Sequence, residues 1–538
     1  MSLTICCALA GMAIVFLLIP VILDVSQRWK WLQRSRELHH TSNNPVPRLG
    51  GIALAAAFLG VEVFIAVSSP DGRANMRDHT IVILSSLAMF ALGLWDDLRA
   101  LGAKRKLVGQ LLIASAVYFA GLGIQKFQIP FTGKVLDLGA IGFLATVIWL
   151  VAMTNLINLI DGVDGLAGGI CLMLMTLLAY VGHQSGSFEG LVAGMAGAIL
   201  GFLWFNFPPA RIYLGDGGAY FLGFQVGLFS LVSSQKGTVL AAMVAPLFVL
   251  ALPIVDTTLA ILRRGLRGLP IFRPDRRHLH HHMLASGMSR RKVVLWFYAV
   301  TLIFLIMGFA AFLSRGALVP ILLGVSALVL LLCAGKLRFS RGWFSVGRVL
   351  ETSLGMRQEV QYGLSITRWL ALEGHRCSSV EGLWSDFIFT ARKLGFCYVK
   401  LALADGERVW QEDPGAEYSN SSLSATHELE GGRFGTLELK APTCPFESPT
   451  SARANCRRWG SSAANCPCVA DSHLFRILGE LLAEGWIKAA GRCAPEPNTA
   501  LAFSTRPSRL LKPTPADTRP AVSEGAGSVA ASGHSVRA

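Results

Sequence analysis

The stretch TNLINLIDGVDGLAGG, residues 154–169, separates two long apolar runs of the chain. Within it Asn155, Asn158, Asp161 and Asp164 recur at every third residue, with four glycines among and after them. On a regular helix, three residues turn a side chain back by about 60°, so these four polar groups would sweep around half of the helix. The glycines lower the cost of a break that would bring the groups together. Carboxylate and carboxamide oxygens suit Mg²⁺, whereas the plainer alternative is a polar turn between two helices.

The composition is typical of a membrane protein. The chain has 538 residues, of which 52% are apolar and 15% are charged, whereas soluble domains carry roughly 25% charged residues. The first of its apolar runs has no basic segment before it, so we expect a retained helix and not a cleaved signal peptide. Eleven apolar runs have about the length that a bilayer requires: 3–24, 50–68, 80–95, 107–124, 138–157, 166–182, 188–206, 218–234, 238–262, 292–313 and 317–334.

Lysine and arginine are divided unevenly between the loops. The loops after the odd-numbered runs hold 18 of these residues, and the loops after the even-numbered runs hold 6. The positive-inside rule therefore places the first set in the cytoplasm and the N-terminus outside. The sequence predicts an all-α polytopic membrane protein with about 11 transmembrane helices and a small α/β-like cytoplasmic tail. All of the unusual polar clusters then face the cytoplasm.

The composition changes after the last apolar run, which divides the chain into three predicted regions. Residues 1–335 form a transmembrane domain. Residues 336–440 form a cytoplasmic accessory region with an α/β-like pattern. Residues 441–538 combine a linker, one amphipathic helix and a disordered end rich in Pro, Ser, Ala and Gly. The basic segment 336–376 is expected to lie against anionic headgroups.

Local patterns in the last two regions predict individual elements. A helix is expected from Leu383 to Leu394, and strands are expected from Phe396 to Leu403 and from Gly435 to Leu439. The amphipathic helix is expected from Leu474 to Ile487.

Two further acidic motifs occupy the predicted cytoplasmic loops. Asp96 and Asp97 end the third apolar run, and Lys106 follows Asp96 by ten residues. A carboxylate pair can orient or deprotonate a nucleophile while nearby cations hold phosphates. Asp216 lies in Leu-Gly-Asp-Gly-Gly before the eighth run, where it can cap a helix or lie beside a metal–diphosphate complex. Charges that snorkel to the membrane border are the plainer alternative for the first motif.

The last long loop reads RPDRRHLHHHML from Arg273 and holds the densest histidine cluster of the chain. The cluster consists of His278, His280, His281 and His282, and Arg273, Arg276 and Arg277 lie beside it. Zinc would want cysteine or carboxylate partners, so we expect this loop to recognise phosphate and sugar groups, with an incidental His-rich loop as the plainer alternative. Together, the loops predict a site for a reaction between a water-soluble phosphorylated substrate and a lipid phosphate.

Four motifs in this order resemble the polyprenyl-phosphate N-acetylhexosamine-1-phosphate transferase family, glycosyltransferase family 4. The resemblance covers about residues 1–335 and is closest to the undecaprenyl-phosphate N-acetylglucosamine-1-phosphate transferases. The phospho-N-acetylmuramoyl-pentapeptide transferases of peptidoglycan synthesis are the alternative branch, although their last loop usually has an Ala-Pro-x-His-His-His-Phe-Glu form. The motifs that carry the resemblance are Asp96-Asp97, the stretch from Asn155 to Leu166, Leu-Gly-Asp216-Gly-Gly and Pro-Asp-Arg-x-His-x-His-His.

This resemblance implies a reaction and roles for the site residues. N-acetylhexosamine-1-phosphate, with N-acetylglucosamine as the first choice of sugar, would pass from a UDP-sugar to polyprenyl phosphate with release of UMP. Asp96 or Asp97 would orient or deprotonate the lipid phosphate. Asp216 and Asn158 would hold Mg²⁺, or Mn²⁺ in its place, against the diphosphate, which Lys106 would contact. Direct attack and a phospho-enzyme route both fit these residues.

The same resemblance implies supporting groups, partners and a location. Asp161 and Asp164 would support the metal and the substrates, while the last loop would cover the sugar phosphate through Arg276, His278, His280 and His281. The expected location is the bacterial inner membrane, with a cytoplasmic active site for the first membrane step of cell-surface polysaccharide synthesis. No nucleic-acid partner is expected, and a homodimer stays open.

Two other classes of protein fit the sequence less well. A transporter would place polar residues in the middle of its spans and on both faces, whereas the acidic motifs here are one-sided. A membrane-anchored sensor would leave the loop motifs unexplained.

Overall fold

The computed structural model describes most of the chain from residue 2 to residue 493. Internal contacts divide the chain into two units, Met1–Leu364 and Ser365–Ala538, whereas the sequence placed the first boundary after residue 335. The described residues are 2–28, 46–68, 76–99, 101–128, 135–186, 188–235, 239–266, 268–269, 279, 283–284, 286–336, 346–377, 379–403, 406–412, 422–429, 434–442 and 472–493.

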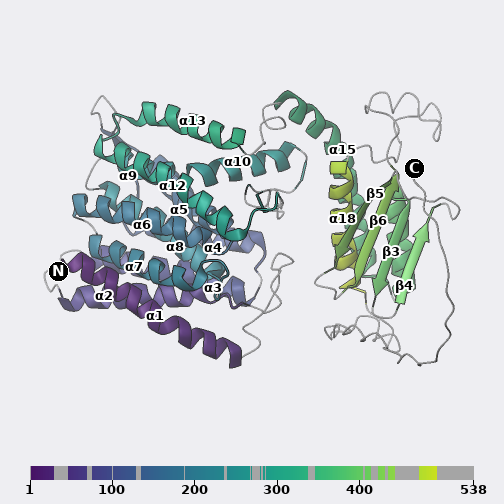
Figure 1. The fold of residues 1–538 in the computed structure, drawn as a ribbon, viewed down its shortest axis with the longest axis horizontal. Coiled ribbons are helices and arrows are strands. Elements are labelled where there is room, and N and C mark those ends of the chain that lie inside the picture. The colour runs from purple at the N-terminus through teal and green to yellow at the C-terminus, as the bar shows by residue number, and fades with distance from the viewer. Residues whose placement is uncertain are drawn as a thin grey trace, which may run out of the picture. The chain divides into compact units, whose positions relative to one another are not determined.

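Within the described residues, the first unit is helical apart from one two-stranded antiparallel sheet of β1 (Lys126–Gln128) and β2 (Val135–Asp137). Figure 1 shows its helices as one bundle, with α1 and α2 on one side and α13 on the other. Another helix, α15 (Val346–Glu373), crosses the boundary between the units. The bundle helices are α1 (Leu3–Arg28), α2 (Gly50–Ser68), α3 (Met76–Leu98), α4 (Ala103–Phe119), α5 (Gly139–Ile160), α6 (Leu166–Ser185), α7 (Glu189–Asn206), α8 (Gly215–Gln235), α9 (Val239–Val249), α10 (Ala251–Leu266), α12 (Arg290–Leu313) and α13 (Val319–Lys336).

The helices follow the apolar runs of the sequence. Each run coincides with one helix, except that the ninth corresponds to the pair α9 and α10, which is bent by 75° between Val249 and Ala251. In the described part of the chain, seven helices are long and apolar enough to cross a membrane, and the bent pair would make eight. The mostly helical fold is therefore confirmed, while the number of eleven spans and their orientation stay predictions.

Helix α8 is surrounded by other helices of the bundle and is the element that positions the site. It packs against α2, α3, α5, α6 and α9, and its residues from Ala219 to Phe229 include a long series of fully buried apolar side chains. Two glycines let the neighbours approach its first turn. A Cβ atom on Gly93 of α3 would lie 2.4 Å from the carbonyl oxygen of Asp216, and one on Gly51 of α2 would lie 2.4 Å from the backbone nitrogen of Gly218. The start of α8 is therefore enclosed by α2 and α3.

The second unit is an antiparallel sheet with helices packed on it. The sheet has the strand order β4-β3-β6-β5, and α18 packs against β5, β6 and α16. The predicted helices and strands are present as α16, α18, β3 and β6, whereas β4 and β5 were not predicted. The predicted division of this part of the chain at residue 440 stays a prediction. The elements are α16 (Val380–Lys393), β3 (Tyr398–Leu403), β4 (Gly406–Gln411), β5 (Ser422–Glu428), β6 (Thr436–Pro442) and α18 (Ser472–Ala490).

Candidate active site

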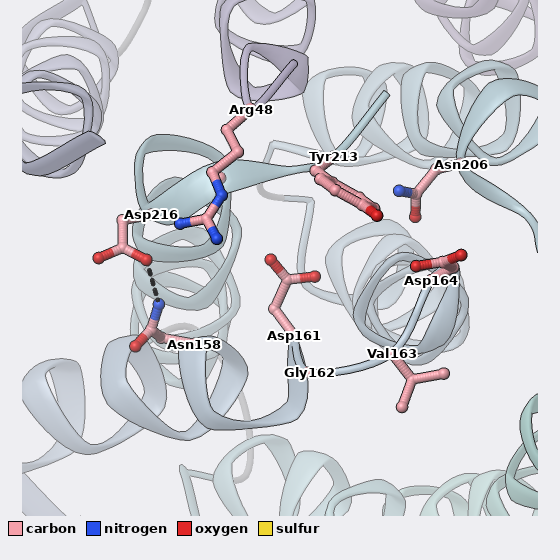
Figure 2. A pocket seen from close by; sticks show the side chains of 10 residues that line it. Arg48, Asn158, Asp161, Gly162, Val163, Asp164, Asn206, Tyr213 and Asp216 are labelled. Carbon is pink, nitrogen blue, oxygen red and sulfur yellow. Dashed lines mark hydrogen bonds between the residues drawn. The ribbon is translucent and has the colours of Figure 1, made fainter. Parts of the chain in front are cut away.

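A polar pocket of about 190 Å³ lies where the end of α5, the end of α7 and the start of α8 come together. In Figure 2 the carboxylate of Asp161 points into this pocket, with the guanidinium of Arg48 between it and Asp216. Acidic residues that two separate sequence motifs supplied, Asp161 and Asp164 from one and Asp216 from the other, are thus gathered at one place. The lining residues are Arg48, Asn158, Asp161, Gly162, Val163, Asp164, Asn206, Tyr213, Gly215 and Asp216.

The carboxylate of Asp97 joins α3 to the first turn of α8. Its Oδ1 accepts a hydrogen bond from the backbone N–H of Asp216 at 3.0 Å, and its Oδ2 accepts one from Gly217 at 2.8 Å. The first N–H groups of a helix have no partner within the helix, so Asp97 caps α8 from a neighbouring helix. The sequence suggested a capping role for Asp216 itself, and the structure gives that role to Asp97. Gly215, with φ of 75°, makes the left-handed turn into the helix.

Lys106 of α4 lies between two carboxylates. Its Nζ is 3.1 Å from Oδ2 of Asp216 and also forms an ion pair with Asp96. Asp96 accepts a second hydrogen bond from the backbone N–H of Leu101 at 2.6 Å. The other oxygen of Asp216 accepts a hydrogen bond from Nδ2 of Asn158 at 3.1 Å. One cation therefore offsets the repulsion between two carboxylates in a partly buried place, where charges interact more strongly than in water.

The turn between α5 and α6 is fixed from the sides. Oδ1 of Asn206 accepts a hydrogen bond from the N–H of Gly165 at 3.0 Å, and the hydroxyl of Tyr298 on α12 donates to the carbonyl of Gly165. Gly165 has φ of 77°, a left-handed conformation that favours glycine. Asp164, within the turn, lies 3.7 Å from the guanidinium of Arg290. The turn thus directs Asp161 into the pocket while Asp164 pairs at its side.

The pocket favours a bound positive charge. Burial, together with the negative charges of Asp216 and Asp97, raises the pKa of the Asp161 carboxyl well above its usual range, although Arg48 opposes this shift. A buried carboxylate beside like charges is stabilised by a proton or by a cation.

The donor set fits a hard divalent cation that keeps part of its own shell. Within the described residues, no three His, Cys, Asp or Glu side chains are arranged to hold a metal ion by themselves. Mg²⁺ usually binds through one or two carboxylates, several waters and substrate phosphates. Asp216 and Asp161 offer carboxylate oxygens for such an open site, and Asn158 lines it beside them.

The structure places seven of the predicted site residues in one neighbourhood: Asp96, Asp97, Lys106, Asn158, Asp161, Asp164 and Asp216. The others, Arg276, His278, His280 and His281, lie outside the described residues.

Sequence reasoning did not select Arg48, Asn206 or Tyr213 as site residues, although they line the pocket. The segment of Arg48 pairs with that of Tyr213 through backbone hydrogen bonds, including the N–H of Tyr213 to the carbonyl of Pro47 at 2.9 Å. The proline- and glycine-rich motif around Arg48 was a usable signal for that residue, and Asn206 stood out as a polar residue at the end of an apolar run, whereas nothing in the local sequence marked Tyr213.

Known proteins match the part of the chain that forms this site. The profile of glycosyl transferase family 4 matches residues 79–234. A protein of Bacillus subtilis (strain 168) described as a probable undecaprenyl-phosphate N-acetylglucosaminyl 1-phosphate transferase is 34% identical over 261 residues, which cover 48% of this chain and 71% of the relative. A decaprenyl-phosphate N-acetylglucosaminephosphotransferase of Mycobacterium tuberculosis (strain ATCC 25618 / H37Rv) is 32% identical over 292 residues, which cover 49% and 71%.

The alternative branch of the family also matches. A phospho-N-acetylmuramoyl-pentapeptide-transferase of Pelotomaculum thermopropionicum is 34% identical over 326 residues, which cover 56% of this chain and 95% of the relative. The resemblance drawn from the four sequence motifs is therefore confirmed, and the chain belongs to glycosyl transferase family 4, the polyprenyl-phosphate sugar-1-phosphate transferases.

Proposed function

We propose that this protein transfers N-acetylglucosamine-1-phosphate from UDP-N-acetylglucosamine to undecaprenyl phosphate at the cytoplasmic face of a bacterial inner membrane. The observation that carries the proposal is the convergence of Asp96, Asp97, Lys106, Asp161 and Asp216 around the first turn of α8. The names of the relatives from Bacillus subtilis and Mycobacterium tuberculosis both refer to N-acetylglucosamine, which supports the choice of sugar, and the name of the first supports undecaprenyl phosphate as the lipid.

The reaction is a phosphoryl transfer between two phosphate groups. An oxygen of the lipid phosphate forms a bond to the β-phosphorus of the UDP-sugar, the bond from that phosphorus to the bridging oxygen breaks, and UMP leaves with the electron pair. Such reactions depend on positioning and on stabilisation of the phosphate charge. Bound Mg²⁺ would supply part of that stabilisation, held by Asp216 with Asp161 and Asn158 beside it.

The contacts favour different roles for the two adjacent aspartates. Both oxygens of Asp97 accept hydrogen bonds from α8, so we assign it the positioning of Asp216. Asp96 instead pairs with the side chain of Lys106, a cation that a phosphate can also bind. We therefore assign to Asp96 the orientation or deprotonation of the lipid phosphate, and to Lys106 the balance of charge on the diphosphate.

A donor panel tests this function. The full chain is incubated in membranes with undecaprenyl phosphate and each of several UDP-N-acetylhexosamines, and UMP release is measured. We expect release with UDP-N-acetylglucosamine and its loss in Asp216→Asn. Release only with UDP-N-acetylmuramoyl-pentapeptide would favour the alternative activity, which the Pelotomaculum thermopropionicum relative supports. If well-folded protein released no UMP with any of the UDP-sugar donors, the proposed function would be overturned.

Metal removal tests the cofactor separately. The open set of carboxylate and amide oxygens needs a hard cation and phosphate oxygens to complete it. We expect EDTA to abolish UMP release and added Mg²⁺ or Mn²⁺ to restore it. Full activity of EDTA-washed membranes without added cation would contradict the cofactor assignment.

A further inference from the structure

The second unit presents apolar side chains that its own core does not cover. Trp369 near the end of α15 and Phe389 on α16 contact each other, with ring centroids 5.7 Å apart. Leu372 lies one helical turn beyond Trp369. The exposed fractions of Trp369, Phe389 and Leu372 are 36%, 49% and 55%. These three residues form the aromatic patch. Exposed apolar side chains that lie together in this way mark an interaction surface.

The opposite faces of the same two helices form the core of the unit. On α15, Thr367 and Leu370 are buried, and both approach Gly485 of α18. On α16, Phe387 is buried and contacts Trp486 of α18, with ring centroids 4.9 Å apart. The aromatic patch therefore lies on the outward faces of α15 and α16, whose inward faces pack against α18.

Basic side chains border the aromatic patch. The Nζ atom of Lys393 lies 5.6 Å from the centre of the Phe389 ring, and Arg368 is the exposed neighbour of Trp369. Glu373, next to Leu372, pairs with Arg376 at 3.6 Å, so its negative charge is partly offset. In the described part of the chain, Arg368 and Lys393 have no carboxylate partner within ion-pair distance, so their charge is available to an outside group.

The chemistry of this surface fits anionic lipid headgroups. Aromatic and aliphatic side chains enter the interfacial region of a bilayer, and arginine and lysine pair with lipid phosphates. The connecting segment has the same character, because residues 336–376 contain seven Lys or Arg and three Asp or Glu. The unit is also joined by the chain to apolar helices that end at Lys336, and such tethering makes weak binding to the same membrane effective.

We propose that the aromatic patch, with Arg368 and Lys393, is a docking surface for anionic phospholipid headgroups of the membrane that holds the first unit. The surface does not overlap the candidate active site, and its test requires no turnover.

Photocrosslinking of the full chain tests the proposal. Phe389 is replaced by p-benzoylphenylalanine, which keeps an aromatic ring in place, and the protein is reconstituted in nanodiscs of phosphatidylcholine with or without phosphatidylglycerol. Mass spectrometry after illumination then identifies what is attached at this position. We expect phospholipid adducts whose yield rises when phosphatidylglycerol is present. The same replacement at Val409, an exposed residue of β4, should give few lipid adducts.

Charge reversal separates lipid binding from general proximity to the membrane. Arg368→Glu combined with Lys393→Glu should lower the lipid adduct at position 389 by on the order of 10-fold or more, since each basic residue near an anionic surface contributes about a 5-fold preference. Arg476→Glu, at an exposed position of α18, is the matched control and should leave the yield unchanged. UMP release in detergent should be unchanged in all variants and confirms that they fold. Adducts to protein, either the first unit or a second copy, or the absence of lipid adducts would overturn the proposal.

Discussion

The side chain of Asp97 contacts the backbone of Asp216 and not its carboxylate: Oδ1 of Asp97 accepts a hydrogen bond from the backbone N–H of Asp216 at 3.0 Å. The carboxylate of Asp216 is thereby left to face Lys106 and Asn158, each at 3.1 Å. One aspartate fixes the start of a helix, and the other presents its charge to the pocket.

This division predicts different defects for two similar substitutions. Asp97→Asn replaces one acceptor oxygen by an NH₂ group, so one N–H of α8 loses its partner. A lost cap costs about 0.5–2 kcal/mol of stability, and a shift of catalytic groups by about 1 Å can cost on the order of 100-fold in rate. We expect less folded protein and a turnover loss of about 100-fold or more, with near-normal nucleotide binding. Asp216→Asn should instead raise the Mg²⁺ requirement. Turnover is compared at matched folded amounts across a Mg²⁺ titration, and normal turnover of both variants would show that these aspartates are structural.

Lys106 is predicted to be essential because it separates Asp96 from Asp216. Lys106→Met keeps most of the side-chain length and removes the charge, which leaves two carboxylates facing each other. We expect UMP release to fall by at least about 100-fold, in line with the loss of a group that stabilises transferred phosphate. Lys104→Met, at an exposed position of the same helix, serves as the control and should retain activity. Equal activity of the two variants would remove Lys106 from the site.

The close approach of α3 to α8 predicts that Gly93 cannot carry a side chain. A Cβ atom there would lie 2.4 Å from the carbonyl oxygen of Asp216 and 2.7 Å from Cα of Gly217. Gly93→Ala should therefore push the helices apart and lower both the thermal midpoint and the activity. Gly265→Ala, where a Cβ atom meets nothing within 4 Å, should be neutral or slightly stabilising, since alanine favours a helix by up to about 1 kcal/mol. If Gly93→Ala and Gly265→Ala change the thermal midpoint equally, the prediction is wrong.

The raised pKa of Asp161 predicts how stability depends on pH without a divalent cation. A carboxyl whose pKa is higher in the folded state binds its proton more tightly there, so its contribution is full below the unfolded pKa of about 4 and is lost as pH rises through the folded value. In EDTA, the thermal midpoint should therefore rise as the pH falls from neutral toward the unfolded pKa of about 4. Asp161→Asn should flatten this dependence and be more stable than the wild type at neutral pH. A variant with an unchanged slope would mean that other groups dominate.

The location of the described site residues predicts that the second unit is dispensable for chemistry. Every residue that lines the pocket lies between Arg48 and Asp216. A chain that ends after residue 340 should therefore release UMP at a measurable rate, although its amount in the membrane can change. Quantification of inserted protein is the control. An inserted truncate without turnover would show that the second unit takes part in the reaction.

The long elements could be predicted from the sequence because length and apolar character decide them locally. Leu3–Arg28 and Arg290–Leu313 are helices wherever they pack, since an apolar segment of that length must satisfy its own backbone in a membrane. The strand β4, Gly406–Gln411, escaped prediction because its charged and polar residues do not alternate with apolar ones. Its position follows from its antiparallel pairing with β3, in which Gly406 lies opposite Leu403.

The acidic residues and Lys106 of the candidate site could be predicted from the sequence, whereas the contacts between them could not. The acidic motifs and Lys106 stood out because charges next to apolar runs are costly unless they are used. The cap from Asp97 to α8 could not be read in the same way, because it depends on how two distant helices pack. Asn206 was missed for the same reason: its amide holds Gly165 and the carbonyl of Ile212, and an asparagine at the end of a helix does not show in the sequence which distant groups it will contact.

The separation of the partners along the chain has a consequence for biosynthesis. Asp97 and Lys106 leave the ribosome 119 and 110 residues before Asp216, since synthesis proceeds from the N-terminus. Until α8 is inserted, both charges lack this partner and need water or headgroups, which are present at the ends of membrane helices and not at their centres. The acidic site is therefore completed late in insertion. A nascent chain arrested before Gly215 would already contain α1 to α7 and yet have no reaction centre.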